Sequence, residues 1–361
     1  MFKYIKLLII KYRINDLIYY FFSKNKFKNK YLNSESQKNE TELKKIFDKY
    51  SNMINSKNNY SKIWKDIINS FYHELTIIFE KKDYKKFKLI MNSFLSSNVI
   101  RGAEDGNLYK NFILRISHKV ALIKSIYIIS RYLNIINYEN PYQPELKKKI
   151  NIYNLYKKIE KKIPIKNLPN IGSPYGYKWK DSVINYRFLE SIYWNLTIKN
   201  FLKINNLEKI NILEIGAGSG LNPLIFYYFF KKKINNYFLV DIPHILLFQE
   251  YFLKNALLEK DEIKKFTFIE NSNLDKINNQ QINIFLNKDS FPEINDKDAE
   301  KYLDFISQNK NSYFFSVNHE SKISGQNNLF ERLKKYSNIH LIEREDFNIR
   351  KGYVKEIYIV K

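Results

Sequence analysis

The stretch Asn211–Asp241 constrains the fold of this chain more than any other. It contains two apolar runs, 210–215 and 237–240, separated by a glycine turn and a helical segment. Short apolar runs that alternate with helices are typical of parallel strands covered on both faces. The glycine turn follows the first run directly, where a ligand can approach the backbone closely. The stretch therefore predicts the first half of a nucleotide-cofactor site.

Glu214 and Leu221 separate this pattern from a dinucleotide site. Glu214 lies near the end of the first strand and Asp241 ends the second, and Leu221 stands where a dinucleotide fingerprint has a third small residue. S-adenosylmethionine has no phosphate and carries a sulfonium and an ammonium, so a carboxylate at a strand end suits it. Asp241 is placed to accept hydrogen bonds from ribose hydroxyls. The pattern favours S-adenosylmethionine, bound by Glu214, Gly216, Ala217, Gly218, Gly220, Asp241 and Ile242.

The rest of the C-terminal half continues the alternation of strands and helices. Three further apolar runs, 266–269, 282–286 and 313–317, predict strands, and a helix is expected at about 326–336. Two extended runs, 339–343 and 353–360, then predict a terminal β-hairpin, which is unusual for a nicotinamide-binding domain. We therefore expect an α/β fold with a mostly parallel sheet.

The first 165 residues have almost no glycine or proline, and their periodicity predicts helices at 5–22, 41–54, 60–80, 83–95 and 111–133. Ser61 and Asp83 are placed as N-caps, and 98–106 reads as a loop. The stretch 163–177 is rich in proline and glycine and predicts a domain junction, before a long helix from about Asp181 to Leu202. We expect a helical domain at 1–165, acting as a lid, in substrate binding or in oligomerisation, and a cofactor domain at 166–361.

The formal net charge of +24 raises the question of a polyanionic partner. The lysines are spread along the whole chain and arginines are few, which favours solvated faces over a nucleic-acid surface. The absence of cysteine excludes disulfides and thiolate chemistry and fits a cytoplasmic protein. The apolar runs of the first 22 residues are broken by charges, so no transmembrane segment is expected there, although a basic helix of this kind can lie on a membrane surface.

Three segments carry a resemblance to a known family: IGSPYGYKWKDSVINYRFL at 171–189, ILEIGAGSG at 212–220 and YFLVDIPHILLFQEYFL at 237–253. Through them residues 172–361 resemble class I S-adenosylmethionine-dependent methyltransferases, and more narrowly the sugar O-methyltransferases of bacterial polysaccharide loci. The resemblance implies a Rossmann-like seven-stranded sheet with its last strand antiparallel. It also implies a sugar, nucleotide-sugar or glycan acceptor.

The carboxyl ends of the later strands hold the other candidate residues, because ligands of open α/β sheets bind at that edge. Asn271 and Ser272 are candidates for the adenine edge, and Asn287 for the cofactor. A sugar hydroxyl needs a general base, for which we expect His319, Glu293 or Asp289. Candidates for contact with the acceptor are Tyr175, Tyr177, Ser290, Phe291 and Asn318. No spacing predicts a metal site.

Two other functions remain open from the sequence. An RNA methyltransferase would agree with the net charge, but the segment 287–293 lacks the D/N/S-P-P-Y/F pattern of amino-group methylation. A non-catalytic Rossmann-like binding subunit would not need Glu214, the glycine turn and Asp241 to be intact. The oligomeric state is not determined by the sequence.

Overall fold

The protein was analysed as a computed structural model, which describes residues 27–32, 40–54, 60–106, 110–136, 151–204, 207–257, 259–320 and 328–361. The helix predicted at 5–22 lies outside the described residues. No helix in these ranges is long and apolar enough to cross a membrane.

A seven-stranded sheet forms the C-terminal half of the chain, in the order β6-β5-β4-β7-β8-β10-β9. Neighbouring strands from β6 to β8 are parallel, whereas β10 is antiparallel to both β8 and β9. This confirms the predicted mostly parallel sheet with its terminal hairpin. The strands are β4 (Ile210–Ile215), β5 (Ile234–Asp241), β6 (Phe266–Glu270), β7 (Ile284–Lys288), β8 (Ser312–His319), β9 (Ile339–Asp346) and β10 (Tyr353–Val360).

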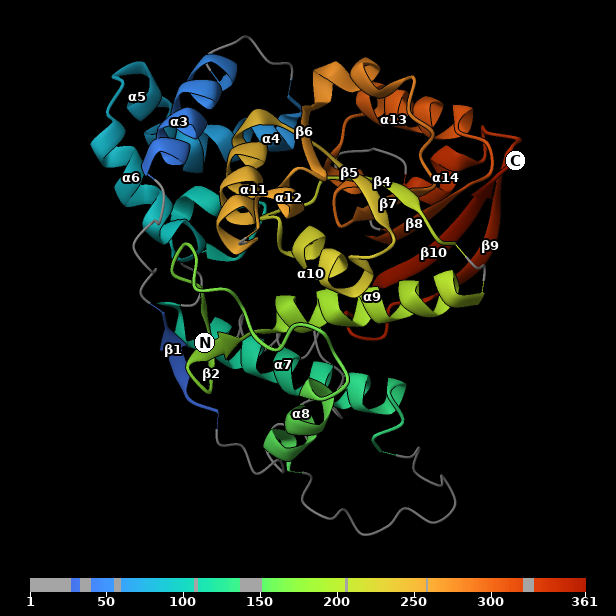
Figure 1. The fold of residues 1–361 in the computed structure, drawn as a ribbon, viewed down its shortest axis with the longest axis horizontal. Helices are drawn as coiled ribbons and strands as arrows, with labels where there is room; N and C mark the ends of the chain where they lie inside the picture. Colours follow the sequence, from blue (N-terminus) through green and yellow to red (C-terminus); the bar gives the residue numbers. More distant parts are fainter. Residues whose placement is uncertain are drawn as a thin grey trace.

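Helices cover both faces of this sheet (Figure 1). One face packs on α9 (Tyr186–Ile204), α10 (Leu221–Phe230) and α11 (Pro243–Ala256), and the other on α13 (Asp296–Gln308) and α14 (Leu329–Leu333). Alternate residues of β4 separate the two cores, since Ile212 belongs to the first and Leu213 to the second. Short elements complete this half: α12 (Lys260–Ile263), η5 (Asn271–Ile277) and η6 (Phe291–Glu293).

The N-terminal helices lie against α11 and α9, away from α13 and α14 (Figure 1). They are α3 (Glu40–Ile54), α4 (Lys62–Ile67), α5 (His73–Glu80), α6 (Tyr84–Ser93), α7 (Phe112–Tyr132) and α8 (Ile152–Glu160). A π-helix, η1 (Ile68–Tyr72), joins α4 to α5, and two 3-10 turns, η2 (Phe94–Ser96) and η3 (Asn98–Ile100), follow α6. Ser61 and Asp83 cap their helices as predicted. One buried apolar cluster contains residues from both sides of the predicted domain boundary at 165/166. The division of the chain into two domains therefore stays a prediction.

A small antiparallel sheet, β1 (Asn29–Tyr31), β2 (Tyr175–Trp179) and β3 (Ser182–Ile184), corrects the sequence prediction for this region. The long helix was expected to start at Asp181 or Ser182, but it begins at Tyr186. Residues 182–184 are instead paired with 177–179, and the Asn185 side chain accepts a hydrogen bond from the Phe188 amide at 2.9 Å. The pairing satisfies the backbone groups of 182–184 outside the helix, which is why α9 starts later.

Candidate active site

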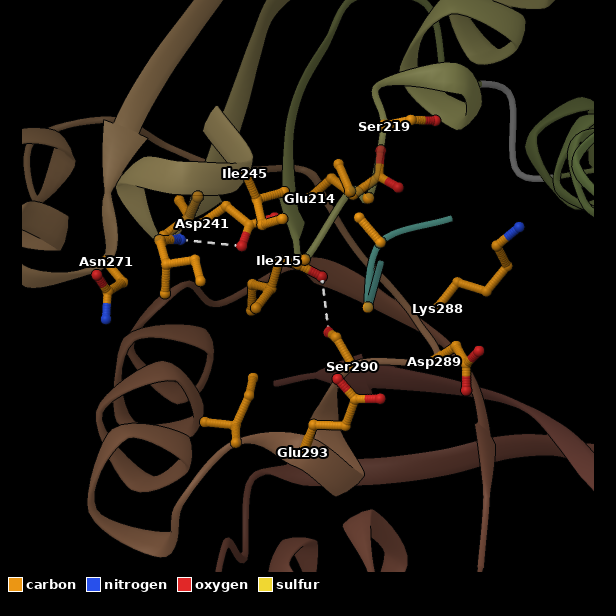
Figure 2. A pocket seen from close by; sticks show the side chains of 18 of the residues that line it. Glu214, Ile215, Ser219, Asp241, Ile245, Asn271, Lys288, Asp289, Ser290 and Glu293 are labelled. Atoms are coloured by element: carbon orange, nitrogen blue, oxygen red, sulfur yellow. Dashed lines mark hydrogen bonds between the residues drawn. The ribbon is translucent and has the colours of Figure 1, made fainter. Parts of the chain in front are cut away.

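A pocket opens at the carboxyl ends of β4, β5 and β7, where the glycine turn leads into α10. Figure 2 shows Asn271 and Asp241 toward one end of this pocket, and Lys288 and Asp289 toward the other. The pocket brings together ten of the residues singled out in the sequence: Glu214, Gly216, Ala217, Gly218, Asp241, Ile242, Asn271, Asp289, Ser290 and Glu293.

Other candidates do not line this pocket. Tyr175 and Tyr177 are buried in the small sheet, where the Tyr177 hydroxyl donates to the Arg115 carbonyl at 3.0 Å. Phe291 is buried in the apolar cluster beneath α13, where its ring packs against those of Tyr302 and Phe314. These three positions were predicted to contact the acceptor, and the structure places them away from the pocket.

Three more candidates are not among the residues that line the pocket. His319 ends β8 and packs edge-on against Tyr353 at 5.6 Å between ring centres, and it does not line the pocket. Gly220 is the N-cap of α10 and has a left-handed backbone. A β-carbon added to it would lie 3.3 Å from the α-carbon of Gln249. Ser272 is exposed on η5.

Asn287 and Asn318 lie below the pocket and position its floor. The Asn318 amide donates to the Asn287 oxygen at 2.8 Å, and the Asn287 amide donates to the Ile215 carbonyl at 2.9 Å and to Ser290 Oγ at 2.5 Å. Both asparagines are buried. They connect β8, β7 and β4 and hold Ser290 beside Gly216, so their predicted roles in direct ligand contact are not supported by their position.

Glu214 is the most enclosed acid of the site. Its carboxylate accepts hydrogen bonds from the Asn222 amide at 2.9 Å and from the Tyr237 hydroxyl. Burial raises the pKa of Glu214 from an ordinary value of 4.5 to about 7, and these two hydrogen bonds offset only part of that rise. A cation bound next to it would favour the carboxylate form.

Asp241 closes β5 and is held in place by its neighbours. The Gln249 amide donates to one carboxylate oxygen at 2.7 Å, and the Ile242 amide to the other at 2.9 Å. Gln249 also donates to the Gly218 carbonyl at 3.1 Å, which ties the glycine turn to α11. Burial raises the pKa of Asp241 to about 7. The carboxylate is therefore oriented before any ligand binds.

Two acids after β7 differ in their proton affinity. Asp289 has a left-handed backbone, with φ +62°, and pairs with Arg350 at 2.6 Å and with the Tyr353 hydroxyl at 2.5 Å. Although burial opposes ionisation, Arg350 and Arg187 hold the pKa of Asp289 below its ordinary value. Burial, followed by the charges of Asp289 and Asp241, raises the pKa of Glu293 to about 8. Glu293 is thus the more basic of the two.

A group of charges beside Asp289 was not found from the sequence. Arg187 of α9 contacts Asp105 at 3.5 Å and Glu190 at 3.5 Å, and Lys288 contacts Glu190 at 3.9 Å. Arg187 and Lys288 line the pocket. They come from separate elements, and no local pattern connects them. The carboxylates of Asp105 and Glu190 balance the charges of Arg187 and Lys288. This end of the pocket is therefore polar but has no large excess of positive charge. No group of three or more histidines and acids within the described ranges could hold a metal ion.

The raised pKa of Glu214 makes the stability of the ligand-free protein depend on pH. The folded state binds this proton more tightly than the unfolded chain. The stability that Glu214 contributes is therefore complete below about pH 4.5 and is lost as pH rises to about 7, in addition to the losses from Asp241 and Glu293. We expect a loss of about 2–3 kcal/mol from this group, and Glu214→Gln should remove most of it. Urea unfolding at pH 5 and pH 8 measures the difference.

Glu300→Gln, an exposed acid paired with Lys335, is the control and should keep the decline of the wild type. An equally steep loss of stability in Glu214→Gln would contradict the assignment.

No protein-family model matches the chain, and no curated protein sequence matches it. Among solved structures, the magnesium protoporphyrin IX methyltransferase of Synechocystis PCC 6803 with bound SAM is 11% identical, with 50% of this chain and 86% of that one covered and a TM-score of 0.36. A SAM-dependent methyltransferase of Aquifex aeolicus is 12% identical, with 44% and 87% covered and a TM-score of 0.32. The methyltransferase domain of bacterial CtHen1 is 13% identical, with 47% and 100% covered and a TM-score of 0.36.

At these identities and TM-scores the likeness does not extend to a substrate or a cofactor. The sheet has the seven strands and the antiparallel last strand that the sequence resemblance implied. The fold therefore agrees with the seven-stranded sheet that the resemblance to class I methyltransferases implied.

Proposed function

We propose that the protein is an S-adenosylmethionine-dependent methyltransferase. The observation that carries this proposal is the pair of acids at adjacent strand ends, Glu214 and Asp241, which flank the glycine turn and open into one pocket. Asp241 would hold the ribose hydroxyls, Asn271 lies toward the adenine end, and the turn 216–219 would face the amino-acid part. The bound cofactor would supply a methyl group on a cationic sulfur.

The acceptor end supports transfer to a hydroxyl. Because methyl transfer is an in-line displacement, the nucleophilic oxygen must be held in line with the methyl group and must lose its proton. Glu293 lies at the pocket and has a pKa of about 8, so its carboxylate is basic enough to take such a proton. Asp289, locked to Arg350 and Tyr353, is suited to accept a hydrogen bond and to orient the acceptor.

We infer a sugar, nucleotide-sugar or glycan hydroxyl as the acceptor, which rests on the sequence resemblance. The polar wall of Asp289, Ser290, Lys288 and Arg187 is compatible with a polyhydroxylated ligand. The test is transfer of labelled methyl from S-adenosylmethionine to a panel of nucleotide sugars, glycans and RNA. Label on a sugar hydroxyl supports the inference, whereas label on RNA alone would replace it with the RNA alternative.

Glu293→Gln tests the base. Since the glutamine cannot take a proton, we expect the turnover rate to fall by about 10²–10³-fold, with little change in cofactor affinity. The wild-type rate should rise as pH passes through about 8 and then level off, because the carboxylate form predominates above this pKa. The variant should lose this pH dependence.

His319→Ala is the matched control, because His319 was a sequence candidate for the same role and does not line the pocket. If His319→Ala loses turnover and Glu293→Gln keeps it, the roles are reversed.

A further inference from the structure

The loop after η3 covers the glycine turn of the cofactor site. Gly102, Ala103 and Glu104 line the same pocket as Glu214 and Asp241, although they belong to the N-terminal helical part of the chain. We call residues 101–104 the covering loop. The sequence predicted only an irregular loop here, with no role.

Three contacts hold the covering loop in place. The Tyr72 hydroxyl, at the end of the π-helix η1, donates to the Arg101 carbonyl at 3.0 Å. Gly102 has φ +97°, and a side chain there would come within 3.1 Å of Trp64. The amides of Ala103 and Glu104 both donate to the Ile100 carbonyl, at 3.1 and 2.9 Å. These contacts fix the position of the covering loop relative to η1 and η3.

The covering loop touches the glycine turn at two points. A β-carbon on Gly218 would lie 3.2 Å from the Ala103 carbonyl oxygen, so the two backbones are close. The Ser219 hydroxyl donates to the Glu104 carboxylate at 2.7 Å. Among the described residues this is the one hydrogen bond of the Glu104 side chain, which leaves its second oxygen for a ligand.

The Glu104 side chain accepts fewer hydrogen bonds from the described residues than Glu214 does. Both oxygens of Glu214 already accept hydrogen bonds, from Asn222 and Tyr237. The nearby cation Arg187 makes its ion pairs with Asp105, Glu190 and Asp289. Burial raises the pKa of Glu104, an effect that the positive charges of Arg187 and Lys288 offset only in part. A buried carboxylate of this kind is stabilised by a cation that donates hydrogen bonds.

We propose that Glu104 binds the ammonium group of S-adenosylmethionine, so that the N-terminal helical part supplies one wall of the cofactor site. The inference rests on the proposed function. Glu104 is attached to Ser219, which Figure 2 shows on the Glu214 side of the pocket, away from Asn271. With ribose on Asp241 and adenine toward Asn271, the amino-acid end of the cofactor lies at the glycine turn. There the ammonium is the hydrogen-bond donor that a carboxylate recognises.

Three ligands and two variants test this by calorimetry on the full chain. Decarboxylated S-adenosylmethionine keeps the ammonium, whereas 5′-methylthioadenosine lacks the whole amino-acid part. For Glu104→Gln we expect binding of S-adenosylmethionine and of its decarboxylated form to weaken by about 10- to 100-fold. Binding of 5′-methylthioadenosine should change less than about twofold, since that ligand has no ammonium to lose. Glu104→Asp, which keeps the charge, should recover part of the affinity.

Glu74→Gln, an exposed acid of the same helical part paired with Lys86, is the control and should bind all three ligands as the wild type does. Equal weakening of all three ligands by Glu104→Gln would mean that the residue only supports the loop, and would overturn the inference. Unchanged binding of S-adenosylmethionine would overturn it as well. If the wild type binds none of the three ligands, the proposed function itself fails.

Discussion

Asp241→Ala will weaken the binding of S-adenosylmethionine by about 100-fold, because two ribose hydroxyls lose a charged acceptor. Hydrogen bonds from Gln249 and Ile242 hold the carboxylate in place. The glycine turn should survive the change, since Gln249 keeps its bond to the Gly218 carbonyl at 3.1 Å. Calorimetry on the folded variant measures the loss.

Asp261→Ala is the control for this experiment, because Asp261 is an exposed acid paired with Lys264. Its affinity should equal that of the wild type. An Asp241→Ala protein that binds the cofactor within about threefold of the wild type would remove the ribose role, and with it the main support for the cofactor assignment.

Gly216→Ala will destabilise the protein by about 2–4 kcal/mol and abolish transfer. Gly216 has φ +71°, which an alanine adopts at a cost of about 1–2 kcal/mol. The added β-carbon would lie 2.3 Å from Ser290 Oγ and 2.4 Å from Ser290 Cβ, so the segment after β7 must move. That segment carries Asp289 and Glu293. Urea unfolding gives the stability, and labelled-methyl transfer gives the activity.

Two variants separate backbone strain from the steric clash. Gly352→Ala has a similar φ of +81° with nothing within 4 Å, so it should show the strain alone, about 1–2 kcal/mol. The double variant Gly216→Ala/Ser290→Gly removes the clash but also the hydrogen bond between Asn287 and Ser290, so it should recover part of the remaining stability. Wild-type stability of Gly216→Ala would show that Ser290 moves freely and that the floor of the pocket is not rigid.

The glycine turn also has a structural role that its sequence did not indicate. From the sequence, Gly216 and Gly218 were expected to leave space for a ligand. In the structure Gly216 makes room for Ser290, and Gly218 makes room for the Ala103 carbonyl. Both glycines are required by the approach of other parts of the protein, which a local pattern does not reveal.

Fewer of the residues predicted to contact the acceptor line the pocket than of those predicted to bind the cofactor. Asp289, Ser290 and Glu293 follow a strand directly, and the rule that strand ends meet at one edge was enough to place them in the pocket. Tyr175 and Tyr177 were chosen for their residue type in a loop, but they pair with β1 and β3 in a small sheet. Their position depended on a strand more than 140 residues earlier in the chain, at 29–31.

The sequence by itself determined the parallel sheet, the terminal hairpin and the acids near the ends of β4 and β5, because periodicity and strand ends are local properties of the chain. The tertiary structure alone decided which distant charges meet there. Glu104, Arg187 and Lys288 come from three separate elements, and packing of the N-terminal part on the sheet brings them to one pocket. The same packing removes water from Glu214, Asp241 and Glu293 and raises their pKa values, since burial is a property of the assembled fold.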